Sequence, residues 1–184
     1  MKKLMIYGAT GYTGRMVAEH AEKAGTPVVL GGRSEGPLAE LAAKLGVDYR
    51  VFALDDDAEI DRALTDVAVL VNAAGPFMRT AKPLMEASIR NRVHYIDSAA
   101  ELDSYRLAEQ LDVEAKAAGV TLLPGGGGSV AMLGSLAGHA IARVKNPGVV
   151  WHLTVRMRPF RLVMAPNLRL VGVSFRAKRL SARR

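Results

Sequence analysis

The fold is decided by Ile6-Tyr7-Gly8-Ala9-Thr10-Gly11-Tyr12-Thr13-Gly14-Arg15, in which glycines recur in a G-x-x-G-x-x-G pattern. The apolar segment 2–7 precedes these glycines, and apolar residues at helical spacing follow them. Strand, tight glycine loop and helix in this order are typical of the phosphate-binding opening of a dinucleotide-binding fold. We expect Gly8 to allow the sharp turn, Gly11 to let the backbone approach a pyrophosphate, and Gly14 to permit close helix packing.

Beyond this loop, short apolar segments alternate with segments of helical periodicity. Predicted strands cover residues 28–30, 49–54, 67–72, 93–96 and 120–123, and predicted helices cover 14–24, 38–45, 58–64, 80–91 and 101–118. Pro83 is expected in the first turn of its helix, and Gly31-Gly32-Arg33-Ser34 as an exit loop. The alternation predicts an α/β fold, a Rossmann-type doubly wound parallel sheet with helices on both faces.

Four consecutive glycines at 125–128 break this alternation and suit either a hinge or a plain linker. We therefore expect a Rossmann domain over residues 1–128. Residues 129–184 are expected to hold a helix over 130–144, a strand over 149–155, the remnant of an incomplete second domain and an irregular, basic, disordered tail.

The composition excludes several kinds of site. The chain has 184 residues and no cysteine, which excludes disulfides, thiolate metal ligands and thiol nucleophiles. His20, His139 and His152 have no partners at metal-ligand spacing, so no metal site is predicted. Because no apolar run could span a membrane and a strand begins almost at once, we expect a cytoplasmic protein without a signal peptide.

Arg33 indicates which dinucleotide this fold would bind. Folds that prefer NAD carry an acidic residue at the end of the second strand, where it binds the ribose hydroxyls. Here that position reads Gly-Gly-Arg-Ser, and a guanidinium can pair with a 2′-phosphate while the Ser34 hydroxyl adds a donor. The sequence therefore favours NADP(H), although a solvated loop arginine is the alternative.

Two further segments close strands at the same predicted edge of the sheet. Asn72-Ala73-Ala74-Gly75-Pro76-Phe77 offers small residues that leave space for a ribose and nicotinamide, although a plain helix-entry turn is the alternative. Tyr95 and Asp97 follow on the next strand, as weak candidates for proton donation and for orienting a ribose or substrate. We favour a helix N-cap as the role of Asp97, and the catalytic residues stay unassigned.

These motifs together, with Tyr-Ile-Asp at 95–97 and Pro-Gly-Gly-Gly at 124–127, resemble the saccharopine dehydrogenase-like oxidoreductases, a family that includes the trans-acting enoyl reductases. The resemblance implies an NADP(H)-dependent protein with an amino-terminal Rossmann domain and a larger second domain that builds the substrate pocket and often a homodimer. It assigns the pyrophosphate to Gly8, Thr10, Gly11, Tyr12, Thr13 and Gly14, the 2′-phosphate to Arg33, and the nicotinamide side to Ala74, Gly75, Pro76 and Phe77.

The chain departs from the family pattern where Phe-Asp is replaced by Gly128-Ser129 and where Ala100 replaces a glycine. These changes affect the substrate side more than the cofactor side. We therefore predict hydride transfer to or from an unidentified small-molecule substrate, impaired by truncation. The alternative is a non-catalytic module that senses NADPH for a partner.

The end of the chain has a different composition from its body. All acidic residues lie before residue 115, and Lys and Arg accumulate from residue 141 onward. A nucleic-acid-binding arm would fit the charge but lacks a recognition motif, and Pro159 and Pro166 interrupt any membrane-surface helix. We favour a third interpretation, a truncated gene or shifted reading frame, and expect neither membrane nor nucleic acid as a partner.

Overall fold

The computed structural model describes residues 2–127, 139, 143, 152–155 and 175–178. The chain divides into two compact units, Met1–Gly134 and Ser135–Arg184. The first unit contains a six-stranded sheet, and the second contains a two-stranded sheet.

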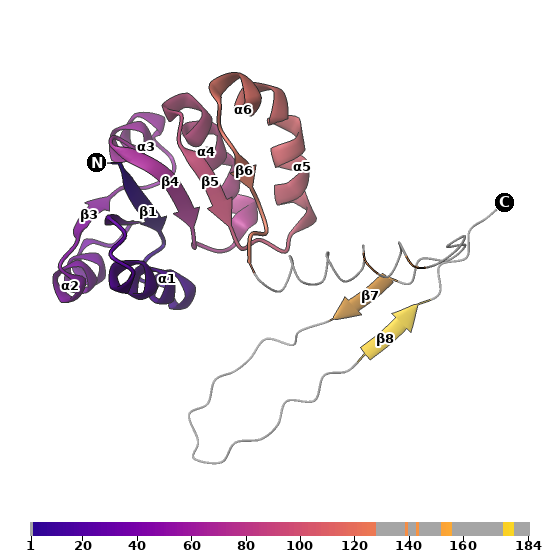
Figure 1. Cartoon of the computed structure of the whole chain (residues 1–184), viewed down its shortest axis with the longest axis horizontal. Coiled ribbons are helices and arrows are strands. Elements are labelled where there is room, and N and C mark those ends of the chain that lie inside the picture. Colours follow the sequence, from indigo (N-terminus) through magenta and orange to yellow (C-terminus); the bar gives the residue numbers. More distant parts are fainter. Residues whose placement is uncertain (1, 128–138, 140–142, 144–151, 156–174, 179–184) are drawn as a thin grey trace, which may run out of the picture. The chain divides into compact units, whose positions relative to one another are not determined.

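Strands and helices alternate through the first unit (Figure 1). The strands are β1 (Lys3–Tyr7), β2 (Val28–Gly32), β3 (Asp48–Val51), β4 (Val67–Asn72), β5 (His94–Asp97) and β6 (Leu122–Leu123). The helices are α1 (Tyr12–Lys23), α2 (Glu35–Leu45), α3 (Asp57–Ala63), α4 (Phe77–Asn91), α5 (Leu102–Gln110) and α6 (Asp112–Ala118). All neighbouring strands are parallel, in the order β3-β2-β1-β4-β5-β6. The predicted doubly wound Rossmann-type sheet is confirmed.

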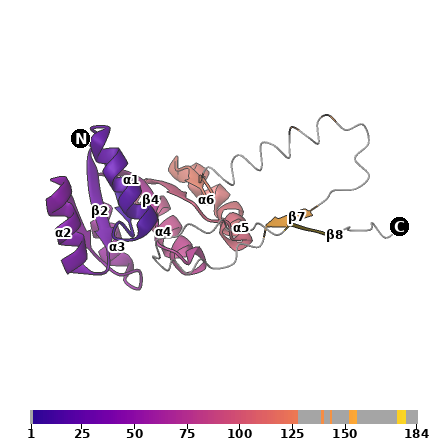
Figure 2. The same ribbon diagram turned by 90° about the horizontal axis from the view of Figure 1, so that it is seen from below.

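Successive residues of β1 supply two separate cores, because side chains alternate between the faces of a strand. Ile6 belongs to the core with α1 and α2, where Leu38 is fully buried. Met5 belongs to the opposite core with α3 and α4, where Leu84 is fully buried. Each such leucine contributes roughly 1.5–3 kcal/mol by leaving water. Helices on both faces therefore bury the sheet (Figure 2).

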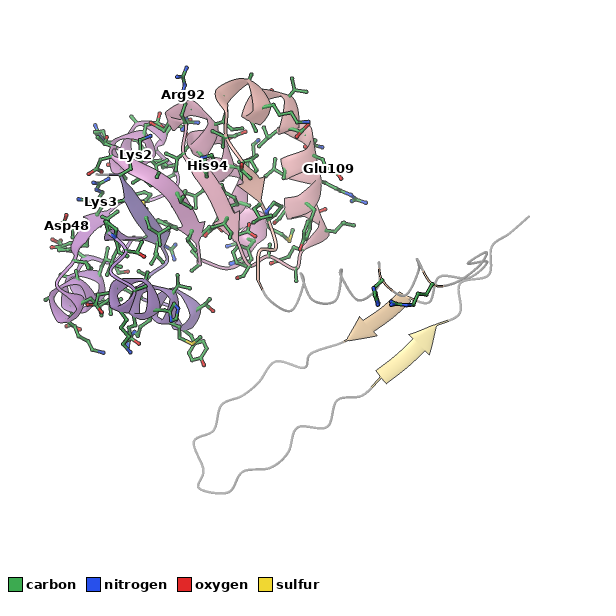
Figure 3. The ribbon with its side chains drawn as sticks, in the orientation of Figure 1. Lys2, Lys3, Asp48, Arg92, His94 and Glu109 are labelled. Carbon is green, nitrogen blue, oxygen red and sulfur yellow. The ribbon has the colours of Figure 1, made fainter. Side chains whose placement is uncertain are left out.

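Charged side chains gather where the strands begin (Figure 3). At the starts of β1 and β3, Lys3 Nζ lies 2.8 Å from Asp48 Oδ2, and it lies 3.5 Å from Asp66 Oδ2 before β4. At the start of β5, the exposed His94 accepts a hydrogen bond on Nδ1 from the backbone N–H of Thr121. These interactions join the segments at which neighbouring strands begin, at the amino-terminal edge of the sheet.

Helix α4 begins at Phe77, three residues before the predicted start. Pro76 takes an extended N-cap conformation (φ −74°, ψ 135°), and the backbone N–H of Arg79 bonds to its carbonyl at 3.0 Å, which starts the helix at once. Pro83 therefore lies inside the helix, and the prediction that it occupies the first turn is wrong. Because Pro83 has no N–H, it cannot bond to the carbonyl of Arg79.

Other element boundaries also differ from the prediction: α2 begins at Glu35 rather than at residue 38, and β3 ends at Val51 rather than at residue 54. The expected single helix over 101–118 is split into α5 and α6 at Leu111, whose backbone (φ −88°, ψ 2°) leaves the helical conformation. Strand β2 continues through Gly31 and Gly32, which were expected in a loop and instead pair with Arg50 and Val51 of β3.

The second unit has antiparallel strands β7 (His152–Val155) and β8 (Phe175–Lys178). Strand β7 corresponds to the last part of the strand predicted over 149–155, whereas β8 was not predicted. The helix predicted over 130–144 lies, apart from residues 139 and 143, outside the described residues.

Candidate functional site

The loops that follow β1 and β4 face each other at the carboxyl edge of the sheet. These two strands are neighbours where the strand order reverses, because β2 lies on the other side of β1. The backbone N–H of Ala73 bonds to the carbonyl of Tyr7 at 2.9 Å, and a Cβ built on Gly8 would lie 2.8 Å from the Cβ of Ala74. Ligands of open α/β sheets bind in the crevice at such a switch point.

The three glycines of the first loop have different surroundings. Gly8 adopts a left-handed conformation (φ +81°), and its N–H bonds to the Gly31 carbonyl at 2.9 Å. A Cβ on Gly14 would press on the Gly8 carbonyl oxygen and lie 2.9 Å from the Ala9 Cα. A Cβ on Gly11 would approach only the Gly8 oxygen, at 3.3 Å, and otherwise meet open space. The geometry thus matches the roles predicted for Gly8 and Gly14, and it leaves space beside Gly11.

The N-terminus of α1 has no side-chain cap. Gly11 is its N-cap residue in an extended conformation (φ −72°, ψ 166°). Because glycine has no side chain, no side-chain hydrogen bond caps the helix, and the first turn contains no acidic residue. Tyr12 is 84% exposed, Thr13 is also exposed, and Thr10 is partly buried. Unpaired N–H groups and the helix dipole make such a terminus attractive to anions.

Arg33 and Ser34 follow β2 directly and are both exposed. Among the described residues, Arg33 forms no ion pair, and the Ser34 side chain does not cap α2 although Ser34 is its N-cap residue. The guanidinium lies near enough to Tyr7 to act on its phenol: burial raises the pKa of Tyr7, and the positive charge of Arg33 opposes that rise. Both residues follow β2, the strand next to β1 and its glycine loop. Neither side chain forms a hydrogen bond or an ion pair with the described residues.

The loop after β4 carries small residues between the strand and α4. Gly75 and Pro76 are exposed and joined by a cis peptide bond, whereas Ala74 and Phe77 are partly buried. The loop is held from within, because the hydroxyl of Thr80 donates a hydrogen bond of 2.7 Å to the Ala74 carbonyl. Gly75 and Pro76 thus stay accessible to solvent, while the hydrogen bond from Thr80 fixes the backbone at Ala74.

Tyr95 lies inside the edge of the sheet, with 1% of its surface exposed. Its hydroxyl donates to Asp97 Oδ2 at 2.7 Å and accepts from Asn72 Nδ2 at 3.0 Å. Burial raises the pKa of Tyr95, and the neighbouring carboxylate of Asp97 raises it further. The structure brings the two weak catalytic candidates together, but in a buried network.

Asp97 is the acidic side chain that is buried within the described part of the chain, with 3% exposed. Besides the Tyr95 hydroxyl, it accepts 2.8 Å hydrogen bonds from the backbone N–H groups of Ala99 and Gly125. Glu101, not Asp97, occupies the N-cap position of α5. The predicted N-cap role is wrong, because the carboxylate points into the protein and satisfies loop N–H groups instead.

Sequence reasoning missed the central position of Asn72, Thr80 and Gly125 in this network. Asn72 is 1% exposed at the end of a strand that is otherwise apolar. A lone amide in such a position is a usable signal, since buried polar side chains need hydrogen-bond partners. The glycines after β6 are closely packed: a Cβ on Gly125 (φ +69°) would clash with the hydroxyl of Tyr105.

The strand order, the glycine loop and the open helix terminus at the switch point define a dinucleotide-binding Rossmann domain. Residues 4–123 match the family described as the saccharopine dehydrogenase NADP binding domain. The chain belongs to this family, and the resemblance found in the sequence is confirmed.

Curated relatives share this part of the chain. A trans-acting enoyl reductase of Mycobacterium leprae is 31% identical over 125 residues, which cover 64% of this chain and 29% of that protein. A lipid droplet localized protein of Caenorhabditis elegans is 29% identical over 111 residues, covering 53% of this chain and 26% of that protein. This chain thus spans less than a third of the length of either relative.

Solved structures support the same fold. Apo saccharopine dehydrogenase (L-Glu forming) from Saccharomyces cerevisiae superposes with a TM-score of 0.67 at 20% identity, covering 82% of this chain and 33% of that one. A short-chain dehydrogenase/reductase from Vibrio parahaemolyticus gives a TM-score of 0.56 at 16% identity, covering 66% of this chain and 76% of that one. At these identities the likeness concerns the fold alone.

The described residues contain neither a membrane-spanning helix nor a cluster of metal ligands. No helix among them combines the length and apolar character that crossing a membrane requires. Within the same residues, no three His, Asp or Glu side chains come together in a way that could hold a metal ion.

Proposed function

We propose that this domain binds NADP(H) across the carboxyl edge of its sheet and serves hydride transfer to or from a small substrate. The observation that carries the proposal is the uncapped N-terminus of α1 after β1, together with Arg33 at the end of the neighbouring strand β2, where it forms no ion pair with the described residues. The family to which the chain belongs is defined by an NADP-binding domain.

The phosphate side of the proposed site rests on the glycine loop. The backbone N–H groups of Tyr12 and Thr13 would receive the pyrophosphate, because no side chain caps the helix. The N–H of Gly11 bonds to the Gly8 carbonyl at 3.0 Å, so Gly11 would contribute the open space through which the pyrophosphate approaches the backbone. Arg33 and Ser34 would hold the 2′-phosphate by charge-assisted hydrogen bonds. The remaining loop residues that we assign to the pyrophosphate are Gly8, Thr10 and Gly14.

The nicotinamide side rests on the loop after β4. Ala74, Gly75, Pro76 and Phe77 would border the nicotinamide and its ribose, since this loop faces the glycine loop across the switch point. When bound, NADP(H) supplies or accepts the hydride. The protein contributes orientation. The name of the mycobacterial relative points to an enoyl group as the first substrate to test.

The test is a titration of the purified chain with NADPH and with NADH. NADPH should bind more tightly, because Arg33 meets a 2′-phosphate that NADH lacks. Equal affinities would contradict the assignment of Arg33 while leaving a dinucleotide site, whereas no binding of either would contradict the whole proposal.

A second candidate function is a module that senses NADPH without turnover. It is favoured by the burial of Tyr95 and Asp97, which withdraws both groups from the ligand edge. NADPH oxidation in the presence of α,β-unsaturated thioesters distinguishes the two functions. Turnover supports the oxidoreductase, and tight binding without turnover of any substrate supports the sensor.

A further inference from the structure

An unbroken series of hydrogen bonds runs from the segment after β6 to the loop after β4, and all but the last of them are buried. The Gly125 N–H donates to Asp97, whose other carboxylate oxygen accepts from the Tyr95 hydroxyl at 2.7 Å. Tyr95 in turn accepts from Asn72 Nδ2 at 3.0 Å. Asn72 then bonds to the loop itself, since its Oδ1 accepts from the Ala74 N–H at 3.0 Å.

Each side-chain donor in this series has an acceptor within hydrogen-bond distance. Both Nδ2 protons of Asn72 are used, one for Tyr95 and one for the Thr80 hydroxyl at 3.0 Å. The Thr80 proton goes to the Ala74 carbonyl and the Tyr95 proton goes to Asp97. Ala74 is thus held by its N–H and by its carbonyl. Fully satisfied buried networks of this kind fix a single local geometry.

The same series fastens the segment after β6. Gly125 is bound through the Asp97 side chain, and the Gly126 N–H donates to the Asp97 backbone carbonyl at 2.7 Å. A Cβ on Gly126 would lie 2.8 Å from atoms of Ile96, so the backbone is packed directly against β5. At the first two of the four glycines, Gly125 and Gly126, neighbouring side chains therefore lie too close to the backbone to leave room for a Cβ.

We propose that Asp97, Tyr95, Asn72 and Thr80 are positioning residues that set the nicotinamide-side loop at Ala74–Phe77 in the geometry that receives the cofactor, and tie it to the segment leaving β6. The proposal rests on the proposed NADP(H) function. It assigns these side chains a role in the nicotinamide half of the site alone, because among the described residues none of them forms a hydrogen bond to the glycine loop or to Arg33.

The test separates the two halves of the cofactor. Dissociation constants are measured for NADPH and for adenosine 2′,5′-bisphosphate, which lacks the nicotinamide half. Tyr95→Phe and Thr80→Val each remove one hydroxyl and its hydrogen bonds. Each should weaken NADPH binding about tenfold, as expected for one or two lost hydrogen bonds. Binding of adenosine 2′,5′-bisphosphate should stay as in the wild type.

Matched variants control for the substitution itself. Ser88→Ala, in the carboxyl half of α4, removes a buried hydroxyl that has no hydrogen-bond partner among the described residues, so both affinities should be unchanged. Thr80→Ser keeps the hydroxyl and should restore the NADPH affinity that Thr80→Val loses. If Tyr95→Phe does not fold, the two Thr80 variants decide the question.

The outcomes are distinct. Selective loss of NADPH affinity in Tyr95→Phe and Thr80→Val, with rescue in Thr80→Ser, supports the positioning role. Unchanged NADPH affinity in both variants, or equal weakening of NADPH and adenosine 2′,5′-bisphosphate, overturns it while the proposed function stands. A wild type that binds neither compound overturns the proposed function and this role together.

Discussion

The hydroxyl of Tyr95 lies 2.7 Å from Oδ2 of Asp97, so a phenol and a carboxylate meet inside the carboxyl edge of the sheet rather than on its surface. Parallel pairing places Asn72 of β4 beside Asp97 of β5, which brings an amide to the same point. Polar groups buried together satisfy one another and fix the loops that they contact. At this edge, buried hydrogen bonds therefore fix the loops from inside, while Gly75 and Pro76 remain exposed to solvent.

Replacing Arg33 by Ala should abolish the preference for NADPH. The substitution removes a charge-assisted hydrogen bond to the 2′-phosphate, worth roughly 1.5–3 kcal/mol, or about ten- to a hundredfold in affinity. NADH affinity should change little. Calorimetric titration of both cofactors measures the effect, and Arg106→Ala, an exposed arginine on α5, is the control. NADPH affinity that survives in Arg33→Ala would place the 2′-phosphate elsewhere.

The same Gly→Ala change should have opposite consequences at two positions of the glycine loop. At Gly14 the new Cβ would press on the backbone of Gly8 and Ala9, so the thermal midpoint should fall by an amount corresponding to roughly 1–3 kcal/mol. At Gly11 the Cβ is nearly accommodated, so stability should persist while NADPH binding weakens. Thermal unfolding and titration of both variants check this. A Gly11 variant with full affinity would make the loop an ordinary turn.

Asp61 should make stability depend on acid pH. Burial opposes its charge, but hydrogen bonds from Arg90 and Asn91 outweigh it and hold the pKa of Asp61 below its usual value. Since the folded pKa is depressed, its contribution is complete above the unfolded pKa of about 3.9 and is lost as pH falls through the folded pKa.

Asp61→Asn should therefore lower the free energy of unfolding at pH 7, and the difference from the wild type should shrink toward pH 3 and below. Urea unfolding across this range provides the measurement. Glu109→Gln, at an exposed position on α5, should show no such convergence. A constant difference at all pH values would mean that Asp61 acts by packing rather than by charge.

The fold was predictable from local signals, because the central strands β1, β2 and β4 are short, mainly apolar runs and the helices between the strands show helical periodicity. The predicted range of β4 matches the observed strand. Predicted helix boundaries were wrong where the backbone conformation of a single residue determines the start or the end of a helix. Pro76 starts α4 earlier than the apolar pattern indicates, and Leu111 divides a segment whose periodicity is continuous.

The candidate site was predictable only in part for a related reason. The glycine loop is contiguous, and Arg33 follows its strand directly, so both could be found by spacing alone. The network of Asn72, Tyr95 and Gly125 joins residues far apart in the chain, and its contacts depend on the register between parallel strands. Local reasoning assigned Asp97 to a helix cap because an acidic residue before a helix commonly serves that role.

The last prediction concerns the ionisation of Tyr95. Its pKa is raised by burial and by the Asp97 carboxylate, so the phenol should stay neutral in the folded chain far into alkaline pH. The unfolded chain should ionise this tyrosine near pH 10. A raised folded pKa favours the folded state fully below that pH, and the advantage is lost as pH rises further.

Tyrosinate absorbance at 295 nm, compared between the wild type and Tyr95→Phe, tests this directly. The difference between the two titrations should appear only where the chain unfolds, as followed by circular dichroism on the same samples. Stability of the wild type should also fall more steeply above about pH 10 than that of Tyr95→Phe. A native transition near pH 10 that Tyr95→Phe lacks would show that solvent reaches the hydroxyl. It would return Tyr95 to the ligand edge as a proton donor, because a phenol that exchanges its proton with solvent can also deliver it to a substrate.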